Sequence, residues 1–129
     1  MRYEEKPQIT EQEIREAMDF STAQVERNLP EFTTKFQKAY SENGFYAPTD
    51  NVDWTTGFWT GEIWLSYEDT GKDIYKKAGE IQIDSFLNRI ENKIEVDHHD
   101  MGFLYSPSCV AGYKLTGNET GRKAAILAA

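Results

Sequence analysis

The sequence predicts an all-α protein that is built from helical hairpins, and three observations support this fold class. Apolar residues recur at helical spacing along most of the chain. The segment at residues 67–78 is repeated at residues 113–124, an offset of 46 positions (113 − 67). The strongest candidate for a strand, residues 94–96, is too short to carry a sheet.

The two copies of the repeat describe a helical hairpin. Seven of twelve aligned positions agree in residue type, which exceeds chance for a gapless pair. Each copy contains a Thr-Gly pair, at 70–71 and at 116–117, and polar residues follow it. A glycine ends a helix in the left-handed conformation, and a polar residue caps the start of the next one. We therefore expect one helix to end and another to begin at each pair.

The first helix is predicted to begin at the capping box Thr10–Glu13, in which the two side chains satisfy each other's backbone amides. It continues to about Leu29, before Pro30 ends it. Residues 31–52 form a long connection that contains at most a short helix at 32–40. The apolar stripe of the first helix is predicted to consist of Ile14, Ala17, Met18, Ser21 and Val25.

The later helices alternate in character. Residues 56–69 are apolar almost all round, which is typical of a buried helix, whereas residues 72–91 are amphipathic. Residues 104–115 are predicted to be buried again, and an outer helix follows them. This alternation predicts an inner and an outer layer. In the helix at residues 72–91 we expect Ile74, Tyr75, Ala78, Ile81, Phe86, Leu87 and Ile90 to face inward, and Lys76, Lys77, Glu80, Asp84 and Arg89 to face outward.

Composition excludes several classes of partner. The net charge of −8 argues against nucleic acid, and no apolar run approaches the roughly 18 to 20 residues that a membrane helix needs. The start of the chain shows no signal peptide, so a cytoplasmic location is expected. The single cysteine, Cys109, fits a reducing compartment and is predicted to pack in the core.

The chain is expected to be a single incomplete domain spanning residues 1–129. It has enough apolar residues for a core, with 39% hydrophobic and 13% aromatic residues. Its last residues, 123–129, are good helix formers and contain none of the residues that close a helix. We therefore expect the chain to stop inside a helix.

Two loops are candidates for a functional site. The segment 98–108, HHDMGFLYSPS, combines a carboxylate, two imidazoles and two aromatic rings where a loop runs into a helix. The offset of 46 sets Asp53-Trp54 against His99-Asp100, and equivalent positions in stacked hairpins lie at the same end of the assembly. We therefore expect both loops to share one rim.

Structural roles compete with functional ones at these positions. Asp100 and Asp53 could each cap the helix that follows. Trp54 and Phe58 could belong to the core, as we expect for Trp59 and Trp64. Adjacent imidazoles do not easily present both rings to one ion, so we expect no metal at His98 and His99 and assign His98 a structural role.

The segments Asn51–Gly61, NVDWTTGFWTG, and His98–Phe103, HHDMGF, resemble the unsaturated glucuronyl hydrolases of glycoside hydrolase family 88. The resemblance extends from about Ile9 to the last residue. It implies an (α/α)6 barrel of the six-hairpin glycosidase type, of which this chain would be about the first third, with the C-terminal remainder absent. It implies no cofactor and no metal.

The resemblance also implies an unusual chemistry. The family releases the 4,5-unsaturated uronic acid from the non-reducing end of lyase-generated oligosaccharides by hydrating its vinyl ether double bond. By matching motifs, Asp100 would be one of two essential aspartates, the second lying beyond Ala129. Trp54 would be the aromatic platform under the unsaturated ring, His99 a polar contact and Phe58 a wall of the subsite.

Two alternatives remain. The sister family that acts on unsaturated rhamnogalacturonan fragments shares the six-hairpin fold, although the HHDMGF string favours the glucuronyl hydrolases. A non-catalytic helical-repeat module would bind protein partners through a stacked surface. Aromatic and acidic residues collected on loops at one end argue against that second alternative.

Overall fold

The computed structural model describes residues 8–129, so the expectation about the start of the chain concerns residues outside this range. The elements, in chain order, are α1 (Glu11–Phe32), β1 (Phe36–Gln37), β2 (Pro48–Thr49), α2 (Thr56–Thr70), α3 (Asp73–Glu91), α4 (Met101–Tyr105), the π-helical segment η2 (Ser106–Val110), α5 (Ala111–Thr116) and α6 (Glu119–Ala128). Segments α4, η2 and α5 follow one another directly and form one helical stretch. The all-α prediction is confirmed.

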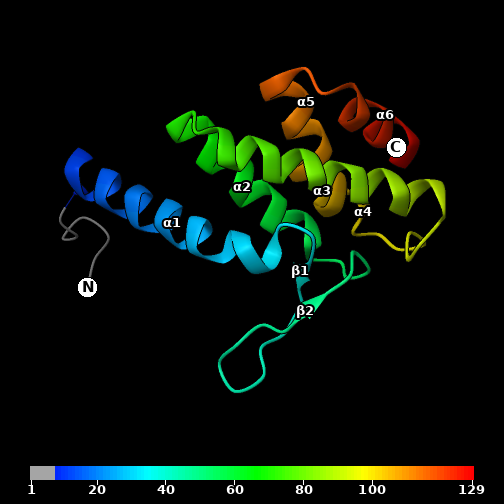
Figure 1. The fold of residues 1–129 in the computed structure, drawn as a ribbon, viewed down its shortest axis with the longest axis horizontal. Helices are drawn as coiled ribbons and strands as arrows, with labels where there is room; N and C mark the ends of the chain where they lie inside the picture. Colours follow the sequence, from blue (N-terminus) through cyan, green and yellow to red (C-terminus); the bar gives the residue numbers. More distant parts are fainter. Residues whose placement is uncertain (1–7) are drawn as a thin grey trace.

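Two helical hairpins, α2–α3 and α4–α5–α6, are stacked side by side. Helix α3 packs against both α2 and α6, and η2 packs against both α2 and α6. The helices therefore form two layers, one containing α2 and the α4–α5 stretch and the other containing α3 and α6 (Figure 1). Helix α1 lies along this stack, and its first turns extend beyond it.

The repeat predicted from the sequence is present in the backbone. Gly71 and Gly117 have φ angles of 67° and 72°, and their amides donate to the carbonyl oxygens of Tyr67 and Tyr113 at 2.7 and 2.8 Å. Such left-handed positions favour glycine, because it has no Cβ to clash with the carbonyl oxygen. The helices that follow begin at Asp73 and Glu119, again 46 residues apart (119 − 73). Both copies therefore make the same turn.

Helix α1 begins as predicted but does not end at Pro30. The capping box of Thr10 and Glu13 is present. The helix continues to Phe32, whose carbonyl oxygen accepts hydrogen bonds from Trp59 Nε1 at 2.8 Å and Gln82 Nε2 at 2.7 Å. Proline removes one backbone donor, but these side chains from α2 and α3 hold the helix end in place. Tertiary contacts outweigh the local preference of Pro30.

The predicted stripe of α1 is wrong in its first half. Ile14 is 49% exposed, and Ala17 and Ser21 are also exposed. The buried residues of this helix are Thr22, Val25, Leu29 and Phe32. Within the described residues, the first half of α1 meets the hairpins through the ion pair of Arg15 with Asp69 at 2.6 Å, and the apolar packing comes from the second half.

The connection after α1 forms a small antiparallel pair of strands instead of a short helix at 32–40. Phe36 pairs with Thr49, and Phe36 is 1% exposed with its ring at right angles to Phe86, 5.6 Å between centroids. Asn43 and Gly44 have φ angles of 52° and 81° at the tip of the loop. An Asn-Gly pair is a strong signal for a tight hairpin turn, and it could have revealed this feature.

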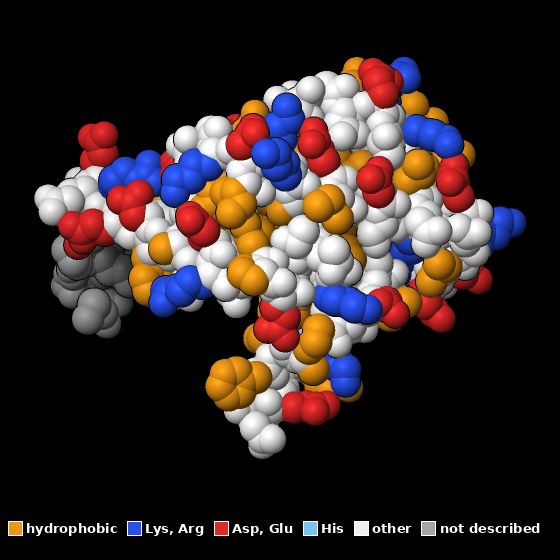
Figure 2. Space-filling model, viewed as in Figure 1, with side chains coloured by type: hydrophobic (Ala, Val, Ile, Leu, Met, Phe, Trp, Pro, Cys, Tyr) orange, Lys and Arg blue, Asp and Glu red, His pale blue; other side chains and the backbone are white. Residues whose placement is uncertain are grey.

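The inward face of α3 differs from the prediction at three positions. Ile74 and Ile81 are 47% and 46% exposed, and they line a groove against α1 in which hydrophobic side chains are visible (Figure 2). Arg89, predicted to face outward, is completely buried. The buried face contains Tyr75, Ala78, Gly79, Gln82, Ile83, Phe86 and Arg89. Arg89 continues the row of Tyr75, Ala78 and Phe86, so its position on the helix determines its burial.

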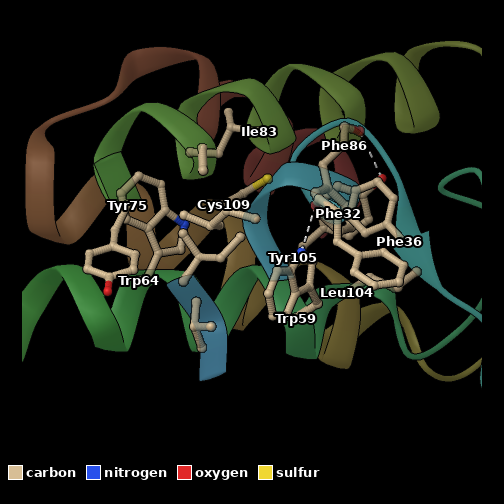
Figure 3. Close-up of a cluster of buried hydrophobic side chains, with 14 of the residues drawn as sticks. Phe32, Phe36, Trp59, Trp64, Tyr75, Ile83, Phe86, Leu104, Tyr105 and Cys109 are labelled. Atoms are coloured by element: carbon tan, nitrogen blue, oxygen red, sulfur yellow. Dashed lines mark hydrogen bonds between the residues drawn. The ribbon is translucent and has the colours of Figure 1, made fainter. Parts of the chain in front are cut away.

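The core lies between the two layers and is rich in aromatic rings (Figure 3). Trp59 and Trp64 are buried, as predicted. The hydroxyl of Tyr105 donates to the carbonyl oxygen of Phe86 at 3.1 Å, which ties α4 to α3. Cys109 is completely buried, and burial raises the pKa of its thiol to about 12. The predicted packing role of Cys109 is confirmed.

The first turn of α2 lies directly on the backbone of α4. A Cβ atom at Gly57 would be 2.1 Å from the carbonyl oxygen of Phe103 and 2.6 Å from that of Leu104. One turn later, a Cβ at Gly61 would be 2.9 Å from the side chain of Pro107, in η2. Proline cannot donate to a helix carbonyl, which is consistent with a widened π-helical segment at this point. Glycine at 57 therefore sets how closely the two inner helices approach.

We expect Gly57→Ala to destabilise the fold by about 1–3 kcal/mol or more, because the added methyl group must push α2 away from a rigid backbone. Urea unfolding followed by circular dichroism measures this. Gly102→Ala is the matched control, since Gly102 is also the second residue of its helix and has open space around it. The control should be neutral or up to about 1 kcal/mol more stable. Equal effects of the two variants would contradict the close-packing argument.

Candidate active site

Three aromatic rings gather where the two candidate loops meet the inner helices. The ring of Trp54 lies 6.3 Å from that of Phe58 and 6.4 Å from that of Phe103, and Phe58 and Phe103 are 5.4 Å apart. The three residues are 44%, 42% and 50% exposed, respectively. Such exposure of large rings at one end of the inner helices is unlike core packing. We name this set the aromatic rim.

Asp100 begins the helix that carries Phe103, and its carboxylate is not used for capping. It occupies the N-cap position of α4, but its side chain makes no capping hydrogen bond in the described structure. The capping interpretation of Asp100 is therefore wrong. Its Oδ1 lies 3.4 Å from Nε2 of His99, whose side chain is 95% exposed. The carboxylate itself is 20% exposed, so it is partly sheltered yet accessible.

His98 holds the loop together. Its Nε2 lies 3.0 Å from the carbonyl oxygen of Glu95, and its Nδ1 accepts the backbone amide of Asp100 at 3.2 Å. This pair of contacts assigns the proton to Nε2. Both ring nitrogens are thus used within the loop, which agrees with the structural role predicted for His98.

A shallow pocket joins His99 to the aromatic rim. It is lined by Phe58, His99, Gly102, Phe103, Ser106 and Pro107. The predicted residues His99 and Phe58 therefore meet at one surface, and the ring of Trp54 adjoins it through Phe103. Phe103 belongs to the segment identified from the sequence, but it was not among the predicted substrate-binding residues. The Gly-Phe pairs at 57–58 and 102–103 were its signal, because they place two phenylalanines at corresponding helix starts.

Asp53 does not cap α2. The N-cap residue is Thr55, and the carboxylate of Asp53 instead accepts the backbone amide of Ala39 at 3.2 Å. The carbonyl oxygen of Asp53 accepts the hydroxyl of Thr56 at 3.2 Å. Asp53 therefore links the segment before α2 to the β1–β2 hairpin region and belongs to the support of the rim.

A second, more polar pocket lies on the other side of Phe58. Its walls come from the end of α1, the hairpin region and α2, and they comprise Asn28, Gln37, Lys38, Ala39, Tyr46, Thr55, Phe58, Trp59 and Glu62. Partial desolvation at this wall raises the pKa of Glu62, although the side chain is exposed at its outer edge. The hydroxyl of Thr55 is buried without a hydrogen-bond partner in the described residues.

Comparison with known proteins gives a consistent result. The unsaturated chondroitin disaccharide hydrolase of Streptococcus pneumoniae is 42% identical over 128 residues, which is 99% of this chain and 32% of that protein. The unsaturated glucuronyl hydrolase of Bacillus sp. strain GL1 is 41% identical over 103 residues, 80% of this chain and 27% of that protein. No protein-family profile matches the chain.

Solved structures agree with the sequence comparison. A crystal structure of the Streptococcus agalactiae unsaturated glucuronyl hydrolase, an Asp-to-Asn variant complexed with dGlcA-GalNAc6S, superimposes with a TM-score of 0.94 at 38% identity. The match covers 98% of this chain and 33% of that one. This chain is homologous to the unsaturated glucuronyl hydrolases. These glycoside hydrolases have an (α/α)6 barrel, so the predicted fold, part of such a barrel, is confirmed.

The chain spans about a third of the length of the unsaturated glucuronyl hydrolases it matches. Among residues 8–129, no helix combines the length and the apolar character required to cross a bilayer. In the same range, His, Cys, Asp and Glu side chains do not gather in a group that could hold a metal ion.

We expect Glu62→Gln to stabilise the protein at neutral and higher pH. Desolvation favours the protonated form of Glu62, so the folded state binds this proton more tightly than the unfolded chain does. The wild type therefore gains stability relative to the variant as the pH falls from the raised pKa of Glu62 in the folded state to its ordinary pKa in the unfolded chain. Thermal unfolding of both proteins across this pH range tests the prediction, and Glu68→Gln, on the exposed part of α2, is the control. A pH-independent difference would contradict it.

Proposed function

We propose that this chain is the N-terminal part of an unsaturated glucuronyl hydrolase and that residues 1–129 are part of a single barrel domain. The chain would contribute one side of the pocket that holds a 4,5-unsaturated uronic acid at the non-reducing end of an oligosaccharide. One observation carries the proposal. Trp54, Phe58 and Phe103 form an exposed rim that shares a pocket with His99, whose Nε2 lies 3.4 Å from Asp100, in a chain homologous to enzymes of this activity.

The aromatic rim suits a sugar ring in size and polarity. An indole face covers the C–H side of a sugar with a large apolar area, and it has few rotatable bonds to immobilise. We propose that Trp54 is the platform under the unsaturated ring and that Phe58 forms a wall of the same subsite. The contacts of both rings with Phe103 restrict their rotation, so little side-chain entropy would be lost on binding.

Asp100 is proposed to act as the ionised carboxylate of the reaction. When C4 of the vinyl ether is protonated, positive charge develops at C5 and the ring oxygen, and a nearby carboxylate stabilises that charge. A carboxylate that does not cap its own helix can also accept hydrogen bonds from sugar hydroxyls. His99, 3.4 Å from Asp100, would donate to the same sugar.

The reaction needs a second carboxyl group that is protonated at working pH. It delivers a proton to C4 and then deprotonates the water that adds at C5, after which the hemiketal opens and releases the remaining sugar. We propose that this acid and base lies in the part of the protein corresponding to the other two thirds of its relatives. A basic group for the substrate carboxylate would come from the same part, since a chain of net charge −8 would otherwise repel a uronate.

The specific substrate is proposed from the relatives. The S. pneumoniae relative is an unsaturated chondroitin disaccharide hydrolase, and the S. agalactiae structure contains dGlcA-GalNAc6S. These names favour an unsaturated glucuronyl sugar over an unsaturated rhamnogalacturonan fragment. We also propose a cytoplasmic location, which the buried free thiol of Cys109 supports.

We expect the 129-residue chain alone to show no turnover of unsaturated chondroitin disaccharide, because the proposed acid and base is contributed elsewhere. The loss of vinyl ether absorbance follows the reaction, and the S. pneumoniae hydrolase is the positive control. Turnover comparable with that enzyme would overturn the proposed division of the active site.

Asp100→Asn is expected to retain sugar binding and to lower kcat by about 10²-fold, because only stabilisation of the transition-state charge is removed. The assay uses a chimera in which this chain replaces the matching third of the S. pneumoniae hydrolase. Asp97→Asn, an exposed carboxylate in the same loop, is the matched control and should retain full activity. If Asp100→Asn turns over as fast as its parent, Asp100 has no part in the mechanism.

A further inference from the structure

Among the side chains of residues 8–129 that lie outside the proposed pocket, Arg89 makes the most hydrogen bonds. It is completely buried near the end of α3, and its guanidinium donates to six oxygen atoms. The acceptors are the carbonyl oxygens of Val52, Asp53, Ile94 and Glu95, the side-chain oxygen of Asn51 and the hydroxyl of Thr56. A guanidinium has five N–H groups in a rigid plane, so its donor capacity is fully used.

These acceptors belong to two loops that are far apart in sequence. Nη1 bonds only to the segment that leads into α2, at Asn51, Asp53 and the first helical residue, Thr56, at 2.9–3.2 Å. Nε bonds only to the segment before α4, at Ile94, 3.1 Å away. Nη2 bonds to both, at 3.3 Å to Val52 and 2.7 Å to Glu95. The first loop leads to Trp54 and the second leads to Asp100, so one planar group spans both approaches to the rim.

The chemistry of these contacts argues for a positioning role beyond plain stabilisation. Within the described residues, no carboxylate oxygen accepts a hydrogen bond from Arg89, and all six partners are neutral dipoles. Burial lowers the pKa of Arg89, which reflects the cost of removing its charge from water. The contacts also constrain geometry, because one rigid planar fork can satisfy these oxygens only when the two loops lie at a fixed separation.

The second loop also needs an external tether. Lys93 and Glu95 have φ angles of 55° and 45°, a left-handed conformation that costs about 1–2 kcal/mol for a residue with a Cβ. Arg89 contacts this turn through both its backbone carbonyl and its guanidinium. Its own carbonyl oxygen accepts the amide of Ile94 at 2.9 Å, and its Nη2 donates to the carbonyl oxygen of Glu95. The same Glu95 oxygen contacts His98, which leads directly to Asp100.

We propose that Arg89 is a positioning residue that sets the distance between the Trp54 loop and the Asp100 loop. It bonds to the backbone on both sides and fixes where the aromatic platform lies relative to the carboxylate. The consequence of this positioning for catalysis rests on the proposed function, whereas the effect of Arg89 on the geometry of the rim does not. A lysine cannot replace it, because an ammonium presents its three donors from one point and cannot reach both loops as the planar fork does.

The test measures rim geometry in the 129-residue chain by NMR. We expect Arg89→Met and Arg89→Lys to lose the nuclear Overhauser contacts between the ring protons of Trp54 and Phe103. Ile83→Ala, a core substitution on the same helix, is the matched control for lost stability and should retain them. Arg122→Met, an exposed arginine on α6, controls for the removal of a positive charge. All spectra are recorded well below the unfolding temperature of the least stable variant.

The outcomes separate the alternatives. Ring contacts that persist in a folded Arg89→Met or Arg89→Lys variant, or that disappear equally in Ile83→Ala, would overturn the positioning role. If neither Arg89 variant folds, Asn51→Ala removes one acceptor and should weaken the same contacts, and unchanged contacts there would refute the proposal. Titration of the Asp100→Asn chimera with dGlcA-GalNAc6S, observed at the indole N–H of Trp54, tests the proposed function separately, because the chimera supplies the basic group that this chain is proposed to lack. Absence of a sugar-induced shift together with lost ring contacts in the variants would refute the function and leave the role of Arg89 intact.

Discussion

The close contact between the first turn of α2 and the backbone of α4 is the constraint on which the rest of the rim depends. Gly57 allows the α2 backbone to lie against the carbonyl oxygens of Phe103 and Leu104. Phe58 and Phe103 flank this contact in sequence, so their rings must meet above it, 5.4 Å apart. Trp54 then completes the cluster. The exposed aromatic surface is thus a result of how two helices pack.

Much of the fold follows from local sequence signals. The repeat predicted both Thr-Gly turns and the starts of α3 and α6, because a left-handed cap and the residues after it depend on a few neighbouring positions. Pro30 and the β1–β2 pair were mispredicted. In the first case Trp59 and Gln82 stabilise the helix end from distant elements, and in the second the burial of Phe36 against Phe86 extends the chain. Such long-range contacts are not encoded in local periodicity.

In the candidate site, too, local signals could be predicted from the sequence and long-range contacts could not. The loops that carry Trp54, His99 and Asp100 could be found from their composition and their equivalence in the repeat. Arg89 could not be found this way, because a charged residue on an amphipathic helix is normally assigned to the outer face. Its burial depends on six oxygen atoms that two separate loops direct toward it. Sequence reasoning can therefore locate the groups that meet a substrate more readily than the group that arranges them.

The identical turns at Gly71 and Gly117 have a consequence for how this architecture can change. Both hairpins reverse direction through the same left-handed cap, so the two units share the same internal turn. Gain or loss of a whole 46-residue unit would preserve the register of the remaining hairpins, whereas a shorter insertion inside a helix would rotate every later side chain away from its partner. Length variation in such proteins should therefore concentrate in the connections, such as the loop between β1 and β2.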